Sequence, residues 1–256
     1  MPHPFLRSMG AVANSGLGLL GMRLVREAHW EPKLPPEAIS FQGDGMLLRG
    51  RNLGFLHDAR FRSAYDKGMN SGHHIGRQPG TSDDIHIDFR VYVECWAAEH
   101  ALHHEGDFVF CGVNTGINPL AICEYIDFAK TDRRMFLFDT YDGIPESQMS
   151  DREKPRGLND NSHMYSECYE LARSNFAAYP NAHLVRGLIP ETLEHVEIER
   201  VAYLSIDMNI AYPERRAIEH FWPKMPSGGL VMLDDYGFTN FEAQHETMNE
   251  FASSVG

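Results

Sequence analysis

Between residues 107 and 235, short apolar runs alternate with stretches of helical pattern, and this alternation constrains the fold more than any other feature. The apolar runs are DFVFC (107–111), MFLFD (135–139), AHLVRG (182–187), VAYLSID (201–207) and GLVMLDD (229–235). Helices are expected at about 119–128, 166–178 and 213–222, and again after Asn240. Short apolar strands separated by helices are typical of a parallel sheet covered on both faces. The sequence therefore predicts an α/β fold of Rossmann-like type.

The residues at the ends of these strands are the place to look for a site. In open parallel sheets, ligands bind beyond the carboxyl ends of the strands. In chain order, the predicted ends read Cys111-Gly112, Asp139, Gly187, Asp207 and Asp234-Asp235. Acidic residues dominate this edge, although acids are also common in ordinary loops.

The turn after the first strand, FCGVNTGIN, is rich in small residues. Gly112 and Gly116 would let the chain turn tightly and bring backbone N–H groups close to a ligand. The spacing is GxxxG rather than the GxGxxG of pyrophosphate-binding turns, and a plain tight connection is an equal alternative. The candidate cofactor contacts are Gly112, Asn114, Thr115, Gly116 and, at the third strand end, Gly187.

Asp139 ends the second strand, where an acid can accept hydrogen bonds from a ribose diol. The alternative is that Asp139 opens the turn of DTYDGIPE, which contains Asp, Gly and Pro. Together with the glycine-rich turn, we favour the ribose role. The two features indicate an adenosine-bearing ligand without a diphosphate.

Asp207, Asp234 and Asp235 end two strands that we expect to be neighbours. Since adjacent strands lie about 4.8 Å apart, these carboxylates can converge on one point. Two adjacent acids at the end of an apolar strand are costly unless a positive charge lies between them. Three oxygen donors without cysteine suit a hard cation such as Mg²⁺. The alternative is that one of the acids caps the following helix.

Composition restricts the classes of function. A formal net charge of −13 argues against non-specific binding to nucleic acid and to an anionic membrane surface. No apolar stretch approaches the roughly 20 residues that a membrane span needs. The four cysteines form no CxxC pair, which favours a reduced cytoplasmic chain over a disulfide framework.

The first third of the chain has a different texture. Residues 1–84 are rich in Pro, Gly and Arg, and we expect short helices and loops that form a lid or contact region on a core of residues 85–256. His73, His74 and His86 match no zinc-binding spacing and are expected in a polar loop. An amphipathic helix up to about residue 102 is predicted by the spacing of Ile85, Phe89, Val93 and Trp96.

Taken together, these residues resemble the metal-dependent sugar O-methyltransferases of the macrocin, mycinamicin and novobiocin type, which act on antibiotics. The resemblance runs from about Asp44 to Phe251 and includes GRNLGFL, GDFVFCGVNTG, FDTYDGIPE and PSGGLVMLDDYG. It implies a class I methyltransferase fold in which S-adenosylmethionine lies across the first two strand ends.

The resemblance also implies roles for the three acids. Asp207, Asp234 and Asp235 would hold Mg²⁺, and the ion would bind the hydroxyl that is methylated. A bound metal lowers the pKa of a hydroxyl, and Asp207 is the expected proton acceptor. The implied substrate is a small-molecule hydroxyl acceptor, a glycosylated natural product of antibiotic biosynthesis, and the chain is expected to be a homo-oligomer.

The chain departs from the family pattern in three places. Phe110 stands where family members carry Glu, and Ile210 stands where catechol-type relatives carry a basic Lys. The given sequence stops at Gly256, whereas family chains continue into an antiparallel hairpin. Two other readings therefore stay open: a relative that has lost cofactor binding and serves as a binding or assembly protein, and a nicotinamide-dependent oxidoreductase. The GxxxG spacing and the lack of a Tyr-x-x-x-Lys pair disfavour the oxidoreductase.

Overall fold

The computed structural model describes residues 39–77, 81, 83–157 and 165–256, which divide between two compact units, Met1–Asn52 and Leu53–Gly256. The described part of the first unit is an antiparallel hairpin of β1 (Ile39–Gly43) and β2 (Met46–Arg49). Short helices and loops were expected here, so the hairpin corrects that prediction. The pair Asp44-Gly45 is the sequence feature that indicates this hairpin, because both residues adopt positive φ, as a tight hairpin turn requires.

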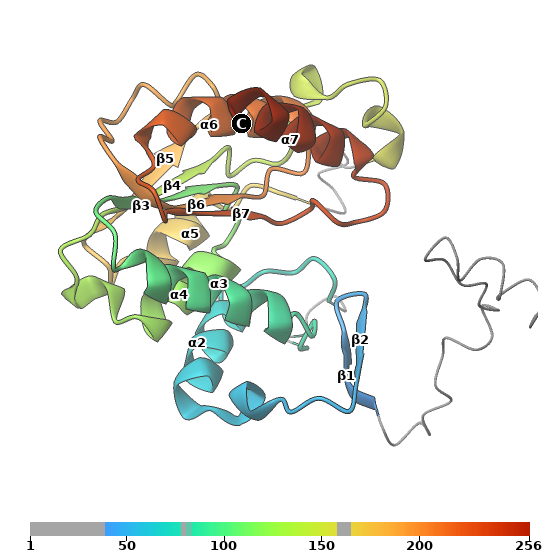
Figure 1. The fold of residues 1–256 in the computed structure, drawn as a ribbon, viewed down its shortest axis with the longest axis vertical. Helices are drawn as coiled ribbons and strands as arrows, with labels where there is room; N and C mark the ends of the chain where they lie inside the picture. Colours follow the sequence, from blue (N-terminus) through green and yellow to red (C-terminus); the bar gives the residue numbers. More distant parts are fainter. Residues whose placement is uncertain (1–38, 78–80, 82, 158–164) are drawn as a thin grey trace, which may run out of the picture. The chain divides into compact units, whose positions relative to one another are not determined.

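The second unit contains a parallel five-stranded sheet in the order β5-β4-β3-β6-β7 (Figure 1). Its strands are β3 (Asp107–Cys111), β4 (Met135–Asp139), β5 (Ala182–Arg186), β6 (Val201–Ile206) and β7 (Leu230–Leu233). This confirms the predicted α/β fold. Because β6 and β7 are neighbours, the acids that follow them leave the sheet side by side.

Helices cover both faces of this sheet, as Figure 1 shows. One face carries α2 (Ala59–Met69), α3 (Asp88–Ala101), α4 (Ile117–Tyr125) and α5 (Tyr169–Asn175). The other carries α6 (Ala211–Phe221) and α7 (Glu242–Val255). Short 3₁₀ turns lie at 54–57, 128–130, 146–148, 154–156 and 222–224.

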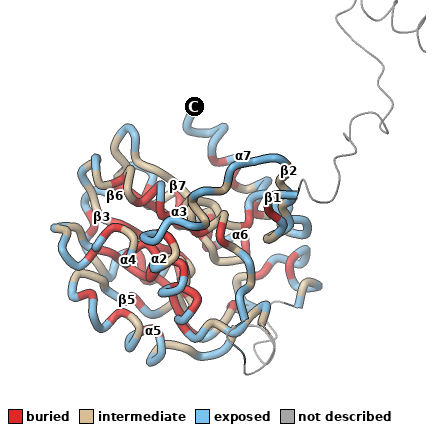
Figure 2. Tube along the Cα trace, turned by 90° about the horizontal axis from the view of Figure 1, so that it is seen from below, coloured by how far each residue is buried: buried red, intermediate tan, exposed pale blue. Residues whose placement is uncertain are grey.

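Side-chain alternation along the strands separates two cores. Phe108 and Phe110 of β3 point into the core under α2 to α5, whereas Val109 and Cys111 point into the core under α6 and α7. Successive residues of a strand face opposite sides, so a strand covered on both faces is apolar throughout. Every residue of β6 is buried, as the tube in Figure 2 shows for the centre of the sheet.

Helix α3 differs in phase from the sequence prediction. It begins at Asp88, and its fully buried side includes Val91, Cys95 and Ala98, whereas Trp96 is 53% exposed. The large apolar residues that set the predicted face were misleading because the tightest packing uses small side chains. The same buried side also carries a charged residue, Glu94.

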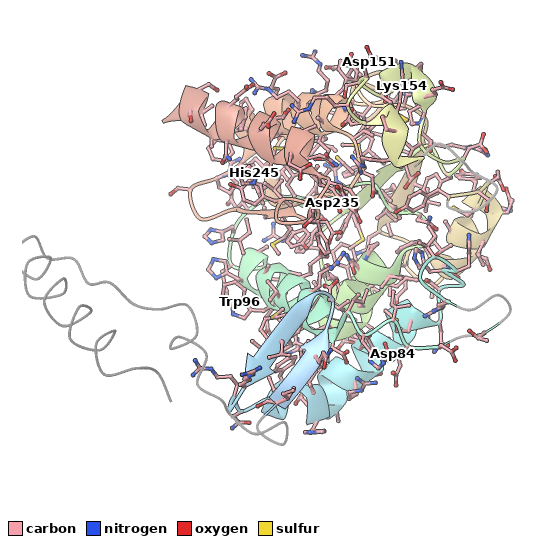
Figure 3. All side chains as sticks on the ribbon, turned by 90° about the vertical axis from the view of Figure 1, so that its right-hand side faces the viewer. Asp84, Trp96, Asp151, Lys154, Asp235 and His245 are labelled. Carbon is pink, nitrogen blue, oxygen red and sulfur yellow. The ribbon has the colours of Figure 1, made fainter. Side chains whose placement is uncertain are left out.

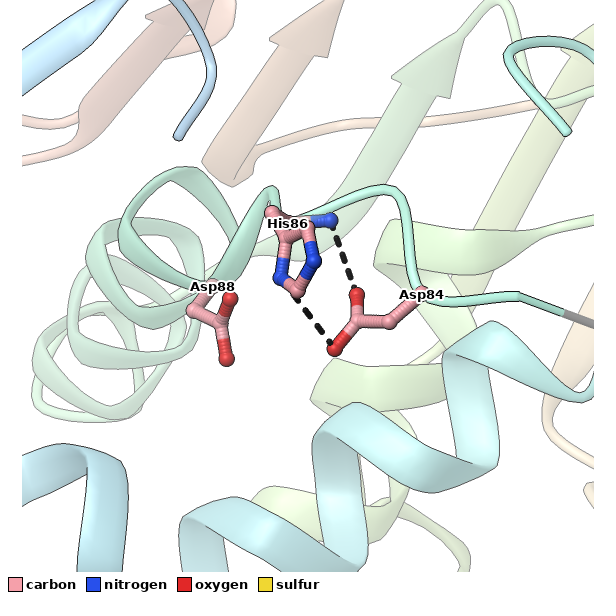
Figure 4. A group of neighbouring side chains, drawn as sticks. All are labelled: Asp84, His86 and Asp88. Atoms are coloured by element: carbon pink, nitrogen blue, oxygen red, sulfur yellow. Dashed lines mark hydrogen bonds and ion pairs between the residues drawn. The ribbon is translucent and has the colours of Figure 1, made fainter. Parts of the chain in front are cut away.

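The start of α3 is tied to α2 by a cluster of Asp84, His86 and Asp88 (Figure 4). Asp84 accepts hydrogen bonds from the Tyr65 hydroxyl at 2.5 Å and from the His86 N–H at 2.8 Å. Asp88 accepts one from Arg62 at 3.0 Å. Since side chains of α2 already bind both carboxylates, we interpret this cluster as a clamp that fixes where α3 begins.

The described residues between Leu53 and Asp84 lie in the same compact unit as the sheet. Helix α2 packs tightly on α4, because a Cβ at Gly68 would lie 2.4 Å from the Ile117 carbonyl oxygen. The lid role expected for residues 1–84 stays a prediction, and its first part falls outside the described residues. Within the described ranges, no helix combines the length and apolar character that crossing a membrane requires.

Candidate active site

A cavity of about 410 Å³ lies at the carboxyl ends of β3, β4 and β6, where the strand-end rule places a ligand. The predicted site residues that line it are Gly112, Asn114, Asp139, Gly187, Asp207, Asp234 and Asp235. The fold therefore brings the glycine-rich turn and the acid cluster to a single cavity.

Gly112 allows these two parts to meet. It adopts φ of +92°, and a Cβ at this position would lie only 1.7 Å from the backbone oxygen of Asp207. The two strand ends are also joined directly, because the Asp207 N–H donates to the Cys111 carbonyl at 2.8 Å. No larger residue fits at Gly112 without moving the end of β6.

Thr115 and Gly116 shape the turn and are not among the described residues that line the cavity. The Thr115 hydroxyl shares a 2.9 Å hydrogen bond with Ser71 and is buried. Gly116 precedes α4 with φ of +102°, and a Cβ there would lie 2.7 Å from the Phe176 ring. Their influence on a ligand would pass through the backbone of the turn.

Asp139 joins the turn after β3 to the turn after β4. Its Oδ2 accepts hydrogen bonds from the N–H groups of Val113 at 2.6 Å and Asn114 at 2.7 Å. Its Oδ1 accepts from the Tyr141 N–H at 2.6 Å. The turn-forming role that the sequence left open is therefore present, and the ribose role stays a prediction.

Asp207, Asp234 and Asp235 offer carboxylate oxygens within 4.8 Å of one another. Asp235, labelled in Figure 3, follows the end of β7 at Leu233. Its Oδ2 is buried and has no hydrogen-bond partner in the described part of the chain. Burial, and then the neighbouring Asp234, raise the pKa of Asp235 to about 7. Burial, together with the charges of Asp234 and Asp235, holds the pKa of Asp207 well above its usual value. The cluster thus has more negative charge than its surroundings neutralise.

Arg90 of α3 contacts this cluster and was missed by the sequence analysis. Its Nη1 donates to Asp234 Oδ2 at 2.6 Å, and both side chains are largely buried. Arg90 also lines the cavity. The two residues are 144 positions apart, so local sequence carries no signal for this pair.

His73 lies in a loop, as expected, and this loop brings its side chain to the cavity. Burial, together with the charge of Arg77, lowers the pKa of His73 to about 4, although a hydrogen bond with Asn114 opposes this shift. Its imidazole is therefore neutral at physiological pH. The loop that carries it is fixed by Arg77, which donates to the carbonyls of Met69 at 2.7 Å and His73 at 2.8 Å.

With this geometry established, the comparisons with known proteins identify the family. Residues 92–254 match the family model of macrocin-O-methyltransferase (TylF). The chain belongs to this family.

Two curated relatives carry sugar O-methyltransferase names. The chain is 25% identical over 160 residues to the 8-demethyl-8-(2,3-dimethoxy-alpha-L-rhamnosyl)-tetracenomycin-C 4'-O-methyltransferase of Streptomyces olivaceus, covering 59% of this chain and 59% of that protein. It is 26% identical over 115 residues to the mycinamicin III 3''-O-methyltransferase of Micromonospora griseorubida, covering 41% and 44%. The matched part spans about half the length of these relatives.

Solved structures show the fold. The O-methyltransferase NovP superposes with a TM-score of 0.60 at 21% identity, covering 75% of this chain and 80% of that one. The calicheamicin methyltransferase CalS11 gives a TM-score of 0.55 at 16% identity, covering 82% and 90%. The TylF family member described here therefore has the class I methyltransferase fold.

In this TylF family member, a buried acid lies behind Phe110. The Phe110 ring packs 5.4 Å from the ring of Tyr203, whose hydroxyl donates to Glu94 at 3.2 Å. Asn118, which lines the cavity, donates to the other Glu94 oxygen at 3.1 Å. Burial and the nearby Asp234 raise the pKa of Glu94 to about 8. Glu94 thus orients Asn118 at the cavity wall from a neighbouring helix.

Proposed function

We propose that this protein transfers a methyl group from S-adenosylmethionine to a hydroxyl on a sugar of a natural product, with Mg²⁺ bound by Asp207, Asp234 and Asp235. One observation carries the proposal: the residues expected to bind the methyl donor and those expected to bind the cation line the same cavity. The glycine-rich turn and Asp139 lie at one end, and the three acids lie at the other. The names of the two curated relatives support a sugar as the acceptor.

The residues around β3 and β4 fit the methyl donor. An ionised carboxylate has about four lone-pair sites, and backbone N–H groups use three of those on Asp139. The Thr140 hydroxyl lies 3.4 Å from Asp139 Oδ1, but its one proton goes to the closer Gly143 carbonyl at 2.6 Å, so one site is left for a ribose hydroxyl. Val113, Phe138 and Ile189 supply apolar wall for an adenine ring. Gly112, Asn114 and Gly187 would present backbone along the rest of the donor.

The acid cluster fits a hard divalent cation. The donor set is all oxygen, and the buried Oδ2 of Asp235 has no hydrogen-bond partner in the described chain. When bound, such a cation acidifies a coordinated hydroxyl and stabilises the charge that develops on its oxygen. The protein's own carboxylates fix where that hydroxyl would lie relative to the donor's methyl group.

Asp207 is the proposed proton acceptor. It stands at the end of β6, between the turn after β3 and the two acids after β7. The side-chain amide of Asn209 donates to Asp207 Oδ1 at 3.3 Å and orients the carboxylate. In the cation-free site, burial and the charges of Asp234 and Asp235 raise the pKa of Asp207.

Phe110 favours a second candidate, a relative that has lost cofactor binding and acts as a binding protein. The acid that the family pattern has at this position is replaced by a ring packed into the core. The buried Glu94, which orients Asn118 beside the same stretch of wall, argues for retained binding. The family assignment disfavours the oxidoreductase reading. A cytoplasmic location and a homo-oligomeric state stay predictions.

Isothermal titration calorimetry with S-adenosylhomocysteine and Mg²⁺ tests the proposal. We expect binding of both ligands with one site per chain. Methyl transfer from labelled S-adenosylmethionine to a panel of glycosylated natural products then tests the reaction. If the folded protein binds neither ligand, the binding-protein alternative replaces the enzyme.

A further inference from the structure

We propose that Arg90 couples the cation site to cofactor binding: it holds Asp234 when no cation is present, and it binds the methionine carboxylate of the donor once a cation occupies the three acids. This inference rests on the proposed function. It assigns Arg90 a role that depends on two ligands together, and it therefore predicts cooperativity that neither site would show alone.

The position of Arg90 follows from the strand order. The strands run β4, β3, β6, β7, so Asp139 lies toward one side of the cavity and Asp234 toward the other. If Asp139 holds the ribose and Asp207 faces the transferred methyl group, the methionine end of the donor lies near the turn after β3. Arg90 lies on α3, which covers the same face of the sheet as α4, and it lines the same cavity as Gly112 and Val113 of this turn.

Among the described side chains that line the cavity, the charges leave one candidate that can bind the carboxylate of a ligand. Of the described residues that line it, Arg90 is the one with a permanent positive charge. The nearby His73 is neutral, because its pKa is lowered to about 4. Four aspartates line the same cavity, namely Asp139, Asp207, Asp234 and Asp235. A ligand carboxylate would be repelled from this cavity unless Arg90 receives it.

The acid cluster determines how strongly Arg90 is held. Arg90 Nη1 donates to Asp234 Oδ2 at 2.6 Å, so the cluster of acids holds the guanidinium directly. A divalent cation would reduce the formal charge of three carboxylates from −3 to −1. The attraction on the guanidinium then weakens and a like charge becomes its neighbour. Cation binding should thus make Arg90 available to an anionic ligand.

The test compares two ligands that differ only in the carboxylate. The first is S-adenosylhomocysteine, and the second is its decarboxylated form, 5′-deoxy-5′-(3-aminopropylthio)adenosine. Calorimetry measures both dissociation constants with and without Mg²⁺ in the wild-type protein. We expect Mg²⁺ to tighten S-adenosylhomocysteine about tenfold or more, and to leave the decarboxylated ligand nearly unchanged. Equal effects of Mg²⁺ on both ligands would overturn the proposal.

The variant Arg90→Gln should remove this difference. In the presence of Mg²⁺, S-adenosylhomocysteine should bind about 10- to 100-fold more weakly than to the wild-type protein, the usual range for a charged hydrogen bond. The decarboxylated ligand should bind as it does to the wild-type protein. Arg90→Lys keeps the charge and should retain part of the preference for S-adenosylhomocysteine over the decarboxylated ligand. This variant provides a second test if Arg90→Gln folds poorly.

Arg156→Gln is the matched control. Arg156 also lowers the pKa of Asp235, but it donates to the Asn209 carbonyl at 3.0 Å and is not among the described residues lining the cavity. Its removal should leave the preference for the carboxylate intact. A preference that persists in Arg90→Gln assigns the carboxylate to the N–H groups at the start of α4 and overturns the inference, while the proposed function stands. Failure of the wild-type protein to bind S-adenosylhomocysteine contradicts the proposed function itself, and the inference with it.

Discussion

The two ends of the cavity hold aspartates in opposite circumstances. At the β4 end, Asp139 accepts three backbone hydrogen bonds of 2.6–2.7 Å, so its charge is satisfied by the fold. At the β6–β7 end, Asp207, Asp234 and Asp235 crowd together, and Asp234 forms an ion pair with Arg90. The first carboxylate stabilises the local structure. At the other end, Asp235 has a raised pKa and a buried oxygen without a hydrogen-bond partner in the described chain, so its ionised form lowers stability until a cation binds.

This difference separates what the fold needs from what the ligand needs. A carboxylate that accepts backbone N–H groups costs stability when it is removed. Removal of a buried carboxylate that lies beside like charges stabilises the protein. The presence of such a carboxylate therefore indicates a function. The same residue type should respond to substitution with opposite signs at the two ends.

The largest expected effect concerns catalysis. Asp207→Asn should lose methyl transfer by about 10²–10⁴-fold, because it removes the proposed general base as well as a cation ligand. Asp234→Asn should lose activity mainly through weaker cation binding, so excess Mg²⁺ should restore part of its rate. Single-turnover methyl transfer at several Mg²⁺ concentrations distinguishes them. Equal defects that Mg²⁺ rescues fully in both variants would show that the base lies elsewhere.

At the other end of the cavity, Asp139→Ala should destabilise the protein by at least about 2 kcal/mol, because three N–H groups lose a charged acceptor. S-adenosylhomocysteine should bind at least tenfold more weakly, while Mg²⁺ affinity changes little. Asp139→Asn keeps one acceptor oxygen and should be milder. Denaturant unfolding and calorimetry measure these effects, and an Asp139→Ala protein with wild-type stability and cofactor affinity would remove Asp139 from both roles.

In the absence of a cation, Asp235→Asn should stabilise the protein, whereas Asp139→Ala should destabilise it. The pKa of Asp235 is raised to about 7, so its contribution to stability is fully present below its unfolded pKa near 3.8 and is lost as the pH rises through 7. At pH 8 the variant should therefore be more stable than the wild-type protein by about 1–3 kcal/mol, and at pH 5 the gain should shrink. Unfolding curves in EDTA at the two pH values measure this, and a less stable variant at pH 8 would refute the account of crowded charges.

The sheet was predictable because its signal is local. The runs DFVFC and MFLFD each contain four consecutive apolar residues and end before Gly or at Asp, so β3 and β4 have the predicted bounds. The convergence of Asp207, Asp234 and Asp235 followed from the order of neighbouring strands. These inferences needed only the geometry of a parallel sheet.

The helical half of the site was not predictable in this way. Arg90 and Glu94 are four residues apart on α3, a spacing that usually indicates a solvent-exposed pair. In the fold, Glu94 is buried and Arg90 bonds to Asp234, because α3 packs beside the ends of β6 and β7. His73 reaches the cavity through a loop fixed by Arg77. Such placements depend on contacts between distant segments, which residue spacing does not contain.

The central claim is that the three acids form one divalent-cation site, and direct titration of the protein with Mg²⁺ or Mn²⁺ tests it most directly. The account predicts one cation per chain in the wild-type protein. Because protons and the cation compete for carboxylates with raised pKa values, binding should be tighter at pH 8 than at pH 6. Asp235→Asn should bind at least tenfold more weakly at pH 8. Absence of binding in the wild-type protein, or equal affinity in Asp235→Asn, would contradict the account.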